Sequence, residues 1–310
     1  MTYKQLTYIL IFIPIGLFSQ QFERVDSYVD NLTVNKTIEM DDLTSRLTEP
    51  FSEDIDKVRA IFYWIADNIE YDYENFKNKT ITSNQVQPET ILIRRKAVCE
   101  GYSNLFKAML NLCDIESEVI SGYARNDIET MFLYESNHAW NSVKIDNEWY
   151  LFDVTWSRDT LNKQVRDFYF KTEPEIFLLN HFPEDSDWLL HDTKYDLDDY
   201  MKFPVYTNLF HDLRFTEYVS TEGYFLANND TVTISIIPRF ECVLLTRLYD
   251  LNKHEWIPTQ MGELTRGDDF FKLFIPRKGK FVLKLGALIQ NDEETNIYKS
   301  IIFYLIDNEE

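Results

Sequence analysis

A polar pair between two alternating runs of residues constrains this chain more than any other feature. Asp146 and Asn147 separate a run that begins at His138 from a run that contains Asp153, and apolar and polar residues alternate in both. Both residues of the pair tolerate positive φ angles, which is typical of a two-residue hairpin turn. Such a turn pairs position 140 with Asp153. His138 and Asp153 are then expected on one face of adjacent strands, in the diagonal relation where side chains meet.

A cysteine at the expected start of a helix supplies a nucleophile for this His–Asp pair. Apolar residues recur at helical spacing from Tyr102 to Cys113, which predicts a helix that begins at about Cys99. A thiol at a helix start feels the positive end of the helix dipole and the unpaired backbone N–H groups there. The same N–H groups are natural donors to an oxyanion at an acyl carbon. Because the basic run 94–96 precedes it, we expect Cys99 to form a thiolate readily.

Three sequence blocks around these residues carry a family resemblance. They read AVCEGYS at 97–103, HAWN at 138–141 and WYLFDVTW at 149–156. Their order, their composition and the gaps of 39 and 15 positions between Cys, His and Asp resemble the transglutaminase-like superfamily. The segment 167–190 resembles the stretch that follows this core in bacterial relatives of the kyphoscoliosis peptidase. The resemblance covers roughly residues 50–192.

This resemblance implies a fold and a set of catalytic roles. The fold is a papain-like α+β core, in which Cys99 is the nucleophile, His138 the base and Asp153 the group that orients the base. Two departures are visible, because Ala97 and Asn147 stand where relatives often carry Gly. Both changes are conservative and leave the assignment of the triad intact.

The chemistry implied by the resemblance is thiol acyl transfer. His138 takes the proton of Cys99, or holds it as an ion pair, while Asp153 fixes the tautomer of the imidazole. The thiolate then attacks an amide carbonyl and forms an acyl-enzyme. If water resolves it, the protein is a peptidase or amidase, and if a lysine amine does, it is a cross-linking transglutaminase. The sequence leaves both outcomes open.

Three further residues are candidates for substrate contact, namely Tyr102, Trp140 and Gln87. The amide of Gln87 is a possible oxyanion donor, although a place on the loop surface is the simpler interpretation. Packing in the core is the corresponding alternative for the two aromatic residues. His181 is interpreted as a capping or core histidine rather than as a group that points into the cleft.

The length of the chain predicts two domains, each with its own core. We expect a catalytic α+β domain at residues 21–203, in which the aromatic-rich segment 167–203 bridges to a second domain at 204–310. Short strand-like runs predict that the second domain is an all-β sandwich of the immunoglobulin-like type. These runs are 224–226, 231–237, 243–249, 270–275, 280–289 and 298–306. Because this domain carries no visible catalytic group, a catalytically silent secreted protein that binds or scaffolds a partner is the alternative function.

The first twenty residues have the pattern of a secretory signal peptide. Lys4 supplies the positive charge, Leu6 to Phe18 the apolar segment, and Ser19 or Gln20 a cleavage point. The apolar segment is short for a membrane span, which needs about 20 residues. We therefore expect a secreted or periplasmic protein without a membrane span after processing, and a retained anchor is the alternative.

Charge and cysteine content narrow the partners further. The net charge of −21 opposes binding to nucleic acid and to anionic membranes, so the expected partner is a protein or peptide substrate. The chain has three cysteines, which argues against a disulfide framework. Cys113 and Cys242 are expected in the core, which leaves Cys99 as a free thiol. No Cys–His spacing indicates a zinc site, and no metal or cofactor is predicted. The oligomeric state is not predicted.

Overall fold

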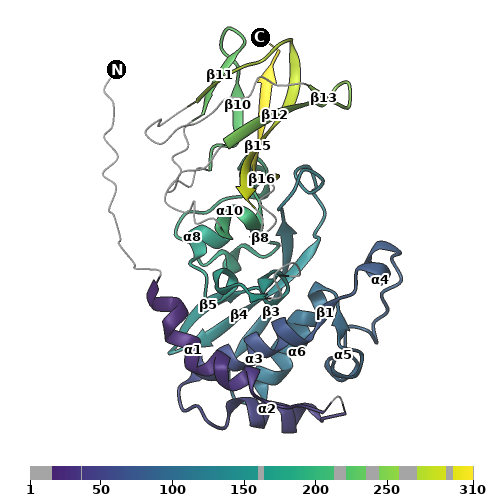
Figure 1. Cartoon of the computed structure of the whole chain (residues 1–310), viewed down its shortest axis with the longest axis vertical. Coiled ribbons are helices and arrows are strands. Elements are labelled where there is room, and N and C mark those ends of the chain that lie inside the picture. Colours follow the sequence, from purple (N-terminus) through teal and green to yellow (C-terminus); the bar gives the residue numbers. More distant parts are fainter. Residues whose placement is uncertain are drawn as a thin grey trace.

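The computed structural model describes residues 16–35, 37–159, 164–212, 221–234, 244–257, 271–290 and 296–309. Figure 1 shows an elongated molecule, with the N-terminal helices at one end of its long axis and the C-terminal strands at the other. Most of the predicted signal peptide lies outside the described residues. Within the described ranges, no helix has both the length and the apolar character that crossing a membrane requires.

Four helices build the layer that carries Cys99. They are α1 (Gly16–Asp30), α2 (Met40–Thr48), α3 (Asp54–Asn68) and α6 (Cys99–Asn111). Helix α3 forms because apolar residues recur every three or four positions, and Val58 and Ile61 are fully buried as a result. Glu53 directly precedes the helix, and no side chain caps it.

A buried guanidinium ties α3 to its neighbours. Arg59 donates to both carboxylate oxygens of Asp26 on α1, at 2.7 and 2.6 Å. It also donates to Asp167, at 2.6 Å, which lies much farther along the chain. Because Arg59 is almost fully buried, removing one partner would leave poorly compensated charge, which typically costs about 3–5 kcal/mol. The helical layer is therefore fixed to the segment that follows the catalytic strands.

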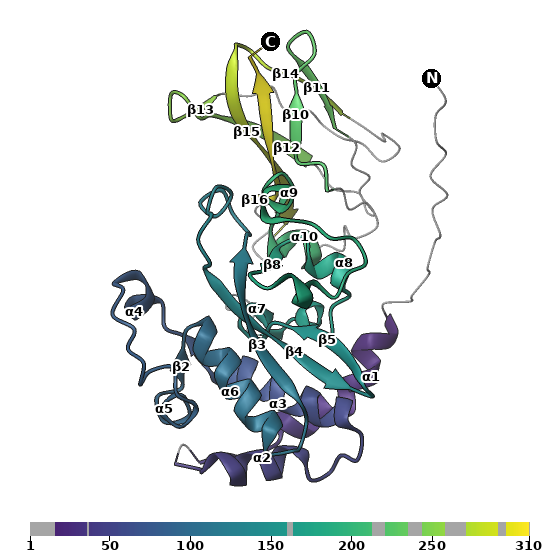
Figure 2. The ribbon, with the colours of Figure 1, turned by 180° about the vertical axis from the view of Figure 1, so that it is seen from behind.

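A four-stranded antiparallel sheet lies against α6, in the order β5-β4-β3-β8. Its strands are β3 (Ser117–Ala124), β4 (His138–Ile145), β5 (Glu148–Phe152) and β8 (His181–Pro183). Figure 2 shows α6 beside β3 and β4. The hairpin prediction is confirmed, because Asp146 and Asn147 have φ angles of 54° and 67° and Ile145 pairs with Glu148.

The β4–β5 ladder ends earlier than predicted. Strand β5 ends at Phe152, which pairs with Asn141, and the chain then turns into helix α7 (Val154–Ser157). Asp153 is the N-cap of this helix, and its side chain accepts a backbone N–H of the first turn. The predicted pairing of position 140 with Asp153 is therefore wrong. Aspartate is a favoured cap, so a helix begins where the alternating pattern suggested a longer strand.

A short parallel ladder lies next to the start of α6. The elements around it are β1 (Glu70–Tyr71), α4 (Tyr73–Lys77), α5 (Pro88–Arg94) and β2 (Lys96–Ala97). The stretch 75–89 therefore carries helical residues at both ends. Strands β1 and β2 pair so that Tyr71 lies opposite Ala97, two positions before Cys99.

Short elements follow α7 and lead to the second sheet. They are β6 (Arg158–Asp159), β7 (Gln164–Val165), η1 (Asp167–Tyr169), α8 (Pro174–Phe177), η2 (Ser186–Leu189), α9 (Leu197–Met201), β9 (Val205–Tyr206) and α10 (Asn208–Asp212). The buried guanidinium of Arg125 donates to the carbonyls of Tyr200 and Met201 at the end of α9. This contact holds the predicted bridging segment 167–203 against the chain just after β3. The domain boundaries themselves stay predictions.

The described strands beyond residue 204 form two sheets. One has the order β10-β16-β15-β12-β13, with β9 also paired to β16, and the other joins β11 to β14. Only the pairing of β10 with β16 is parallel among these described strands. Their bounds are β10 (Tyr224–Leu226), β11 (Thr231–Ile234), β12 (Leu244–Asp250), β13 (Glu255–Ile257), β14 (Phe271–Phe274), β15 (Gly279–Gln290) and β16 (Asn296–Asn308). The immunoglobulin-like topology stays a prediction, because much of 213–270 lies outside the described residues.

The C-terminal sheet contacts the loop that leads to His138. Met131 in that loop is buried against Val205, Val282 and Phe303. The loop between β3 and β4 is therefore packed against the second sheet shortly before it delivers His138 to β4.

Candidate active site

Cys99 begins helix α6, and its side chain is almost fully buried. Val98 precedes the helix in an extended conformation and no side chain caps it, so the first-turn N–H groups lack intrahelical partners. Burial raises the pKa of the Cys99 thiol, but the hydrogen bond to His138 and the charge of that imidazole lower it. The backbone N–H groups of Ala139 and Glu100 act in the same direction, and the resulting pKa is below its ordinary value. The site therefore favours a thiolate.

The basic run before Cys99 has a different role from the predicted one. Arg94 pairs with Asp72 at 2.6 Å, and Lys96 lies 3.9 Å from Glu70. Two of the three cationic groups thus have carboxylate partners of their own. The lowered pKa of the thiol is caused by the imidazole and the backbone N–H groups.

His138 opens strand β4 and is buried beside the thiol. Its Nε2 lies 2.8 Å from Oδ2 of Asp153, so Nδ1 is the ring nitrogen left for the hydrogen bond to Cys99. Burial alone would lower the pKa of His138. The charge of Asp153 and the hydrogen bonds to Asp153 and Cys99 outweigh burial and raise this pKa to about 10. Near neutral pH the pair is therefore expected as a thiolate and an imidazolium.

Asp153 is completely buried and is held by three donors. Its Oδ1 accepts the backbone N–H of Trp156 at 3.0 Å, while Oδ2 faces the imidazoles of His138 and His181. Burial would raise the pKa of this carboxyl, but the charge of His138 and the hydrogen bonds of both imidazoles hold it well below its usual range. The carboxylate is thus a fixed negative charge behind His138.

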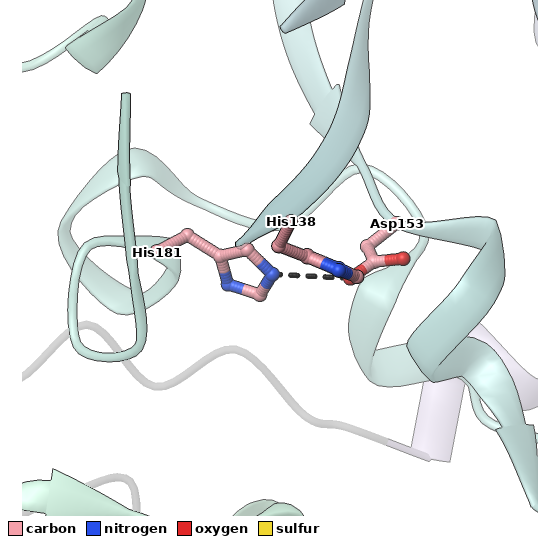
Figure 3. A group of neighbouring side chains, drawn as sticks. All are labelled: His138, Asp153 and His181. Carbon is pink, nitrogen blue, oxygen red and sulfur yellow. Dashed lines mark hydrogen bonds and ion pairs between the residues drawn. The ribbon is translucent and has the colours of Figure 1, made fainter. Parts of the chain in front are cut away.

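His181 is buried and hydrogen-bonded, as the core interpretation predicts, but sequence reasoning missed its contact with Asp153. It opens strand β8, and its Nε2 lies 3.0 Å from Oδ2 of Asp153, the same oxygen that faces His138 (Figure 3). Burial lowers its pKa to about 4, so this imidazole is neutral at pH 7. The sequence signal available was its place in the segment 167–190, which resembled relatives beyond the three motif blocks.

Aromatic rings enclose the two imidazoles. The ring centroid of Trp156 lies 4.9 Å from that of His138 and 4.6 Å from that of His181. Phe177 stacks on His181 with centroids 4.0 Å apart, and Trp140 lies edge-on at 5.1 Å. Such surroundings exclude water, which strengthens the electrostatic interactions among the buried groups.

The structure corrects two of the three predicted substrate contacts. Tyr102 is 1% exposed, and its hydroxyl donates to the carbonyl of Ile69. Trp140 is also 1% exposed and belongs to the main hydrophobic core. Both side chains therefore pack rather than face a substrate. Gln87 is exposed and donates to the carbonyl of Ser83, so its role toward a substrate stays a prediction.

The two other cysteines differ from Cys99. Cys113 follows α6 and is half-buried rather than fully buried as predicted, with its sulfur 3.8 Å from the hydroxyl of Thr48. Burial raises the pKa of Cys113, in the opposite direction to the shift at Cys99. Cys242 lies outside the described residues.

Among the described residues, one cluster has its potential ligand atoms close enough to hold a metal ion. Its members are His138, Asp153 and His181, whose ligand atoms lie within 4.8 Å of one another. Both Nε2 atoms, however, lie at hydrogen-bond distances from one carboxylate oxygen. A metal at the centre of this group would have to replace these hydrogen bonds. The chemistry of the cluster is therefore accounted for by proton-donating imidazoles and one accepting carboxylate.

Comparisons with known proteins agree with the motif blocks. Residues 41–154 match the model of the transglutaminase-like superfamily. The human kyphoscoliosis peptidase is 34% identical over 181 residues, which cover 55% of this chain and 27% of that protein. The mouse protein of the same name is 26% identical over 295 residues, which cover 92% of this chain and 43% of that protein. The chain thus spans less than half the length of these two relatives.

One solved structure, titled "Crystal structure of a TGase", is 21% identical in sequence and superimposes with a TM-score of 0.29. The aligned region covers 46% of this chain and 34% of the chain in that structure. Residues 41–154 are therefore similar to a transglutaminase-like domain, and this region combines helices with an antiparallel sheet. Members of this superfamily are usually cysteine peptidases or acyltransferases.

Proposed function

We propose that this transglutaminase-like domain is a thiol enzyme that acts on amides of proteins or peptides. Cys99 is the nucleophile, His138 the acid–base group and Asp153 the residue that orients the imidazole. One observation carries the proposal: the imidazole that lowers the pKa of the Cys99 thiol has its Nε2 held 2.8 Å from a buried carboxylate. A nucleophile, a base and a group that orients the base are the parts that this chemistry needs.

The reaction follows from these positions. The Cys99 thiolate attacks the carbonyl carbon, and the N–H groups at the start of α6 are suited to donate hydrogen bonds to the developing oxyanion. The imidazolium of His138 gives its proton to the leaving amine, and a thioester remains on Cys99. An incoming water or amine then loses a proton to His138 and displaces the thiolate, which restores the enzyme.

The acceptor decides between hydrolysis and acyl transfer. The names of the two kyphoscoliosis peptidases support hydrolysis, so we propose a peptidase or amidase activity first. Transfer to a primary amine uses the same thioester, and no observed group excludes it. A direct assay mixes a glutamine-containing protein with a labelled primary amine and follows ammonia, labelling and cleavage together. The proposal is wrong if Cys99→Ala retains full activity on any substrate that the wild-type protein processes.

An exposed aromatic cluster supports a polypeptide substrate. Tyr71 lies near the start of α6, because it pairs with Ala97, two positions before Cys99. Its ring contacts those of Tyr73 and Phe76, with centroids 4.6 and 5.8 Å away. These two side chains are 66% and 50% exposed. We propose that apolar side chains of the substrate pack on this aromatic shelf, defined as Tyr71, Tyr73 and Phe76.

The alternative function is a catalytically silent protein that binds or scaffolds a partner. The reactivity of the thiols separates the two functions. In an enzyme, iodoacetamide should alkylate Cys99 far faster than Cys113 or Cys242 in the folded protein. Equal, slow alkylation at all three sites would favour the silent protein.

We further propose that the protein is exported, on the evidence of the N-terminal pattern. The sequence there combines one basic residue, an apolar segment and a small polar cleavage region. N-terminal sequencing of the protein recovered from its native host tests this. A first residue at position 20 or 21 supports export, and an intact Met1 with retention inside the cell contradicts it.

A further inference from the structure

We propose that His181 is a positioning residue of the active site, which holds Asp153 so that the carboxylate can orient His138. The inference rests on the proposed function, because it assigns a task within the same triad. His181 does not reach the thiol or a substrate. It acts on Asp153 alone, and through Asp153 on the base.

The geometry at the carboxylate supports this task. The Nε2 atoms of His138 and His181 lie 2.8 and 3.0 Å from one oxygen of Asp153. The second oxygen accepts the backbone N–H of Trp156. With three donors the carboxylate has no freedom to rotate away from His138, and without His181 the second donor on Oδ2 would be missing. Water cannot readily replace that donor, because Asp153 and His181 are fully buried.

Donor and acceptor chemistry specifies how His181 is protonated. A neutral imidazole carries one N–H, and Asp153 can only accept, so this N–H lies on Nε2. Nδ1 then needs a donor, and the side-chain amide of Asn180 faces it, with its oxygen Oδ1 placed 2.7 Å away. The amide of Asn180 meets this demand when its NH2 end faces the ring, because the two ends of an amide have nearly the same shape. The proton on Nε2 is therefore directed at Asp153.

The opposite end of the Asn180 amide faces residues from other segments of the chain. The amide of Asn180 lies 3.2 Å from the hydroxyl of Tyr169 and 3.3 Å from Nε2 of His211. The hydroxyl of Tyr169 is in turn 2.6 Å from the amide oxygen of Asn208. A continuous buried polar chain thus runs from helix α10 to Asp153, and stacking of His181 on Phe177 fixes the plane of its ring.

Two substitutions separate positioning from simple packing. His181→Phe keeps an aromatic ring for stacking but removes the N–H, whereas His181→Gln offers a new N–H near the position of Nε2. We expect kcat to fall about ten- to hundredfold in His181→Phe, as loss of a hydrogen bond to a charged group implies, with KM little changed. His181→Gln should recover most of the lost rate. His191→Phe is the control, because His191 is partly exposed and, among the described residues, its side chain hydrogen-bonds to Thr193 and not to Asp153.

The pH dependence of kcat/KM separates the two roles, because a purely structural role of His181 would leave it unchanged. In His181→Phe the carboxylate of Asp153 interacts with one imidazole, His138, instead of two. The pKa of His138 should therefore rise, and the alkaline limb of the kcat/KM profile should move to higher pH. His181→Gln should return the limb toward its wild-type position. Wild-type kcat and pH profile in folded His181→Phe, or an equal loss in His181→Gln, would overturn the proposal.

A measurement on the unmodified protein does not depend on the folding of any variant. In a protein with 15N-labelled histidines, His181 should be neutral from pH 6 to 8, with its proton on Nε2 and slow exchange with solvent. A proton on Nδ1, or rapid exchange, would contradict the assigned role. If Cys99→Ala retains full activity, the proposed function fails, whereas failure of the His181 tests alone leaves the triad in place.

Discussion

Asp153 lies 2.8 Å from His138, although the strand that leads toward it ends one residue earlier. Its carboxylate therefore has two tasks, because one oxygen caps helix α7 and the other faces the imidazole. The backbone position is fixed by the cap, and the cap in turn directs the free oxygen at His138. A single aspartate thus joins the local structure of the chain to the chemistry proposed for the site.

The first prediction concerns Asp153→Asn. An asparagine can still cap α7 through its amide oxygen, but its NH2 group would face the imidazole of His138 and favour the wrong tautomer. We expect kcat to fall on the order of 10³-fold. Asp196→Asn is the matched control, because Asp196 caps α9 and has no contact with His138. Equal activity of Asp153→Asn and the control would contradict the orienting role.

The second prediction is the pH dependence of thiol alkylation. The pKa of Cys99 is lowered by His138, whereas burial raises that of Cys113. Cys99 should therefore react with iodoacetamide well below pH 9, where Cys113 stays protonated. His138→Ala should remove this advantage, which mass mapping of the alkylated peptides can measure at each pH. Parallel pH curves for the two thiols would argue against an activated Cys99.

The third prediction is a loss of stability in acid. The pKa values of His181 and His211 are about 4 and about 3, both because of burial, and both lie below the ordinary value of 6.5. The unfolded chain therefore binds these protons as the pH falls through 6.5, while the folded protein does not. Their contribution is fully present above pH 6.5 and falls by up to on the order of 3 kcal/mol each as the pH drops through these folded values.

Denaturant unfolding at pH 7, 6 and 5 measures this effect. His211→Phe should show a shallower loss than the wild-type protein, because it removes one buried group that must charge. The opposite shift of His138, to about 10, adds stability that is full below pH 6.5 and is lost as the pH rises through 10. A flat stability between pH 7 and 5 would contradict the assignment of neutral, buried imidazoles.

The fourth prediction concerns the aromatic shelf. Replacing Tyr73 and Phe76 by Ser removes apolar surface near the start of α6, so KM for an apolar peptide should rise about tenfold while kcat changes little. Phe274→Ser is the control, because Phe274 is 61% exposed but lies on β14 in the C-terminal region. An unchanged KM in the double variant would place the substrate elsewhere on the surface.

Local patterns in the sequence were sufficient to predict the turn and the helix start that bring the triad together. The turn at Asp146 and Asn147 and the start of α6 at Cys99 both depend on residues close together in the chain. The signal that places Tyr102 in the core was also present, because Tyr102 shares the helical stripe of Phe106. A residue on the buried stripe of a helix is a poor candidate for substrate contact.

The role of His181 could not be derived in the same way. It lies 28 positions after Asp153 and reaches the carboxylate because β8 pairs with β3 across the sheet. No local periodicity encodes that pairing, and the partners of Asn180 come from still later in the chain. The immunoglobulin-like topology likewise depends on pairings between strands that are far apart in the sequence, and it stays a prediction.

The most direct test of the central claim is to trap the acyl-enzyme. The protein is mixed with a substrate found in the amine and cleavage assay, quenched in acid within milliseconds to seconds, and mapped by peptide mass spectrometry. We predict a thioester adduct on the peptide that contains Cys99, absent from His138→Ala and removed by added water-soluble amine in the wild-type protein. Turnover without any adduct on Cys99, or undiminished turnover in Cys99→Ala, would contradict the account.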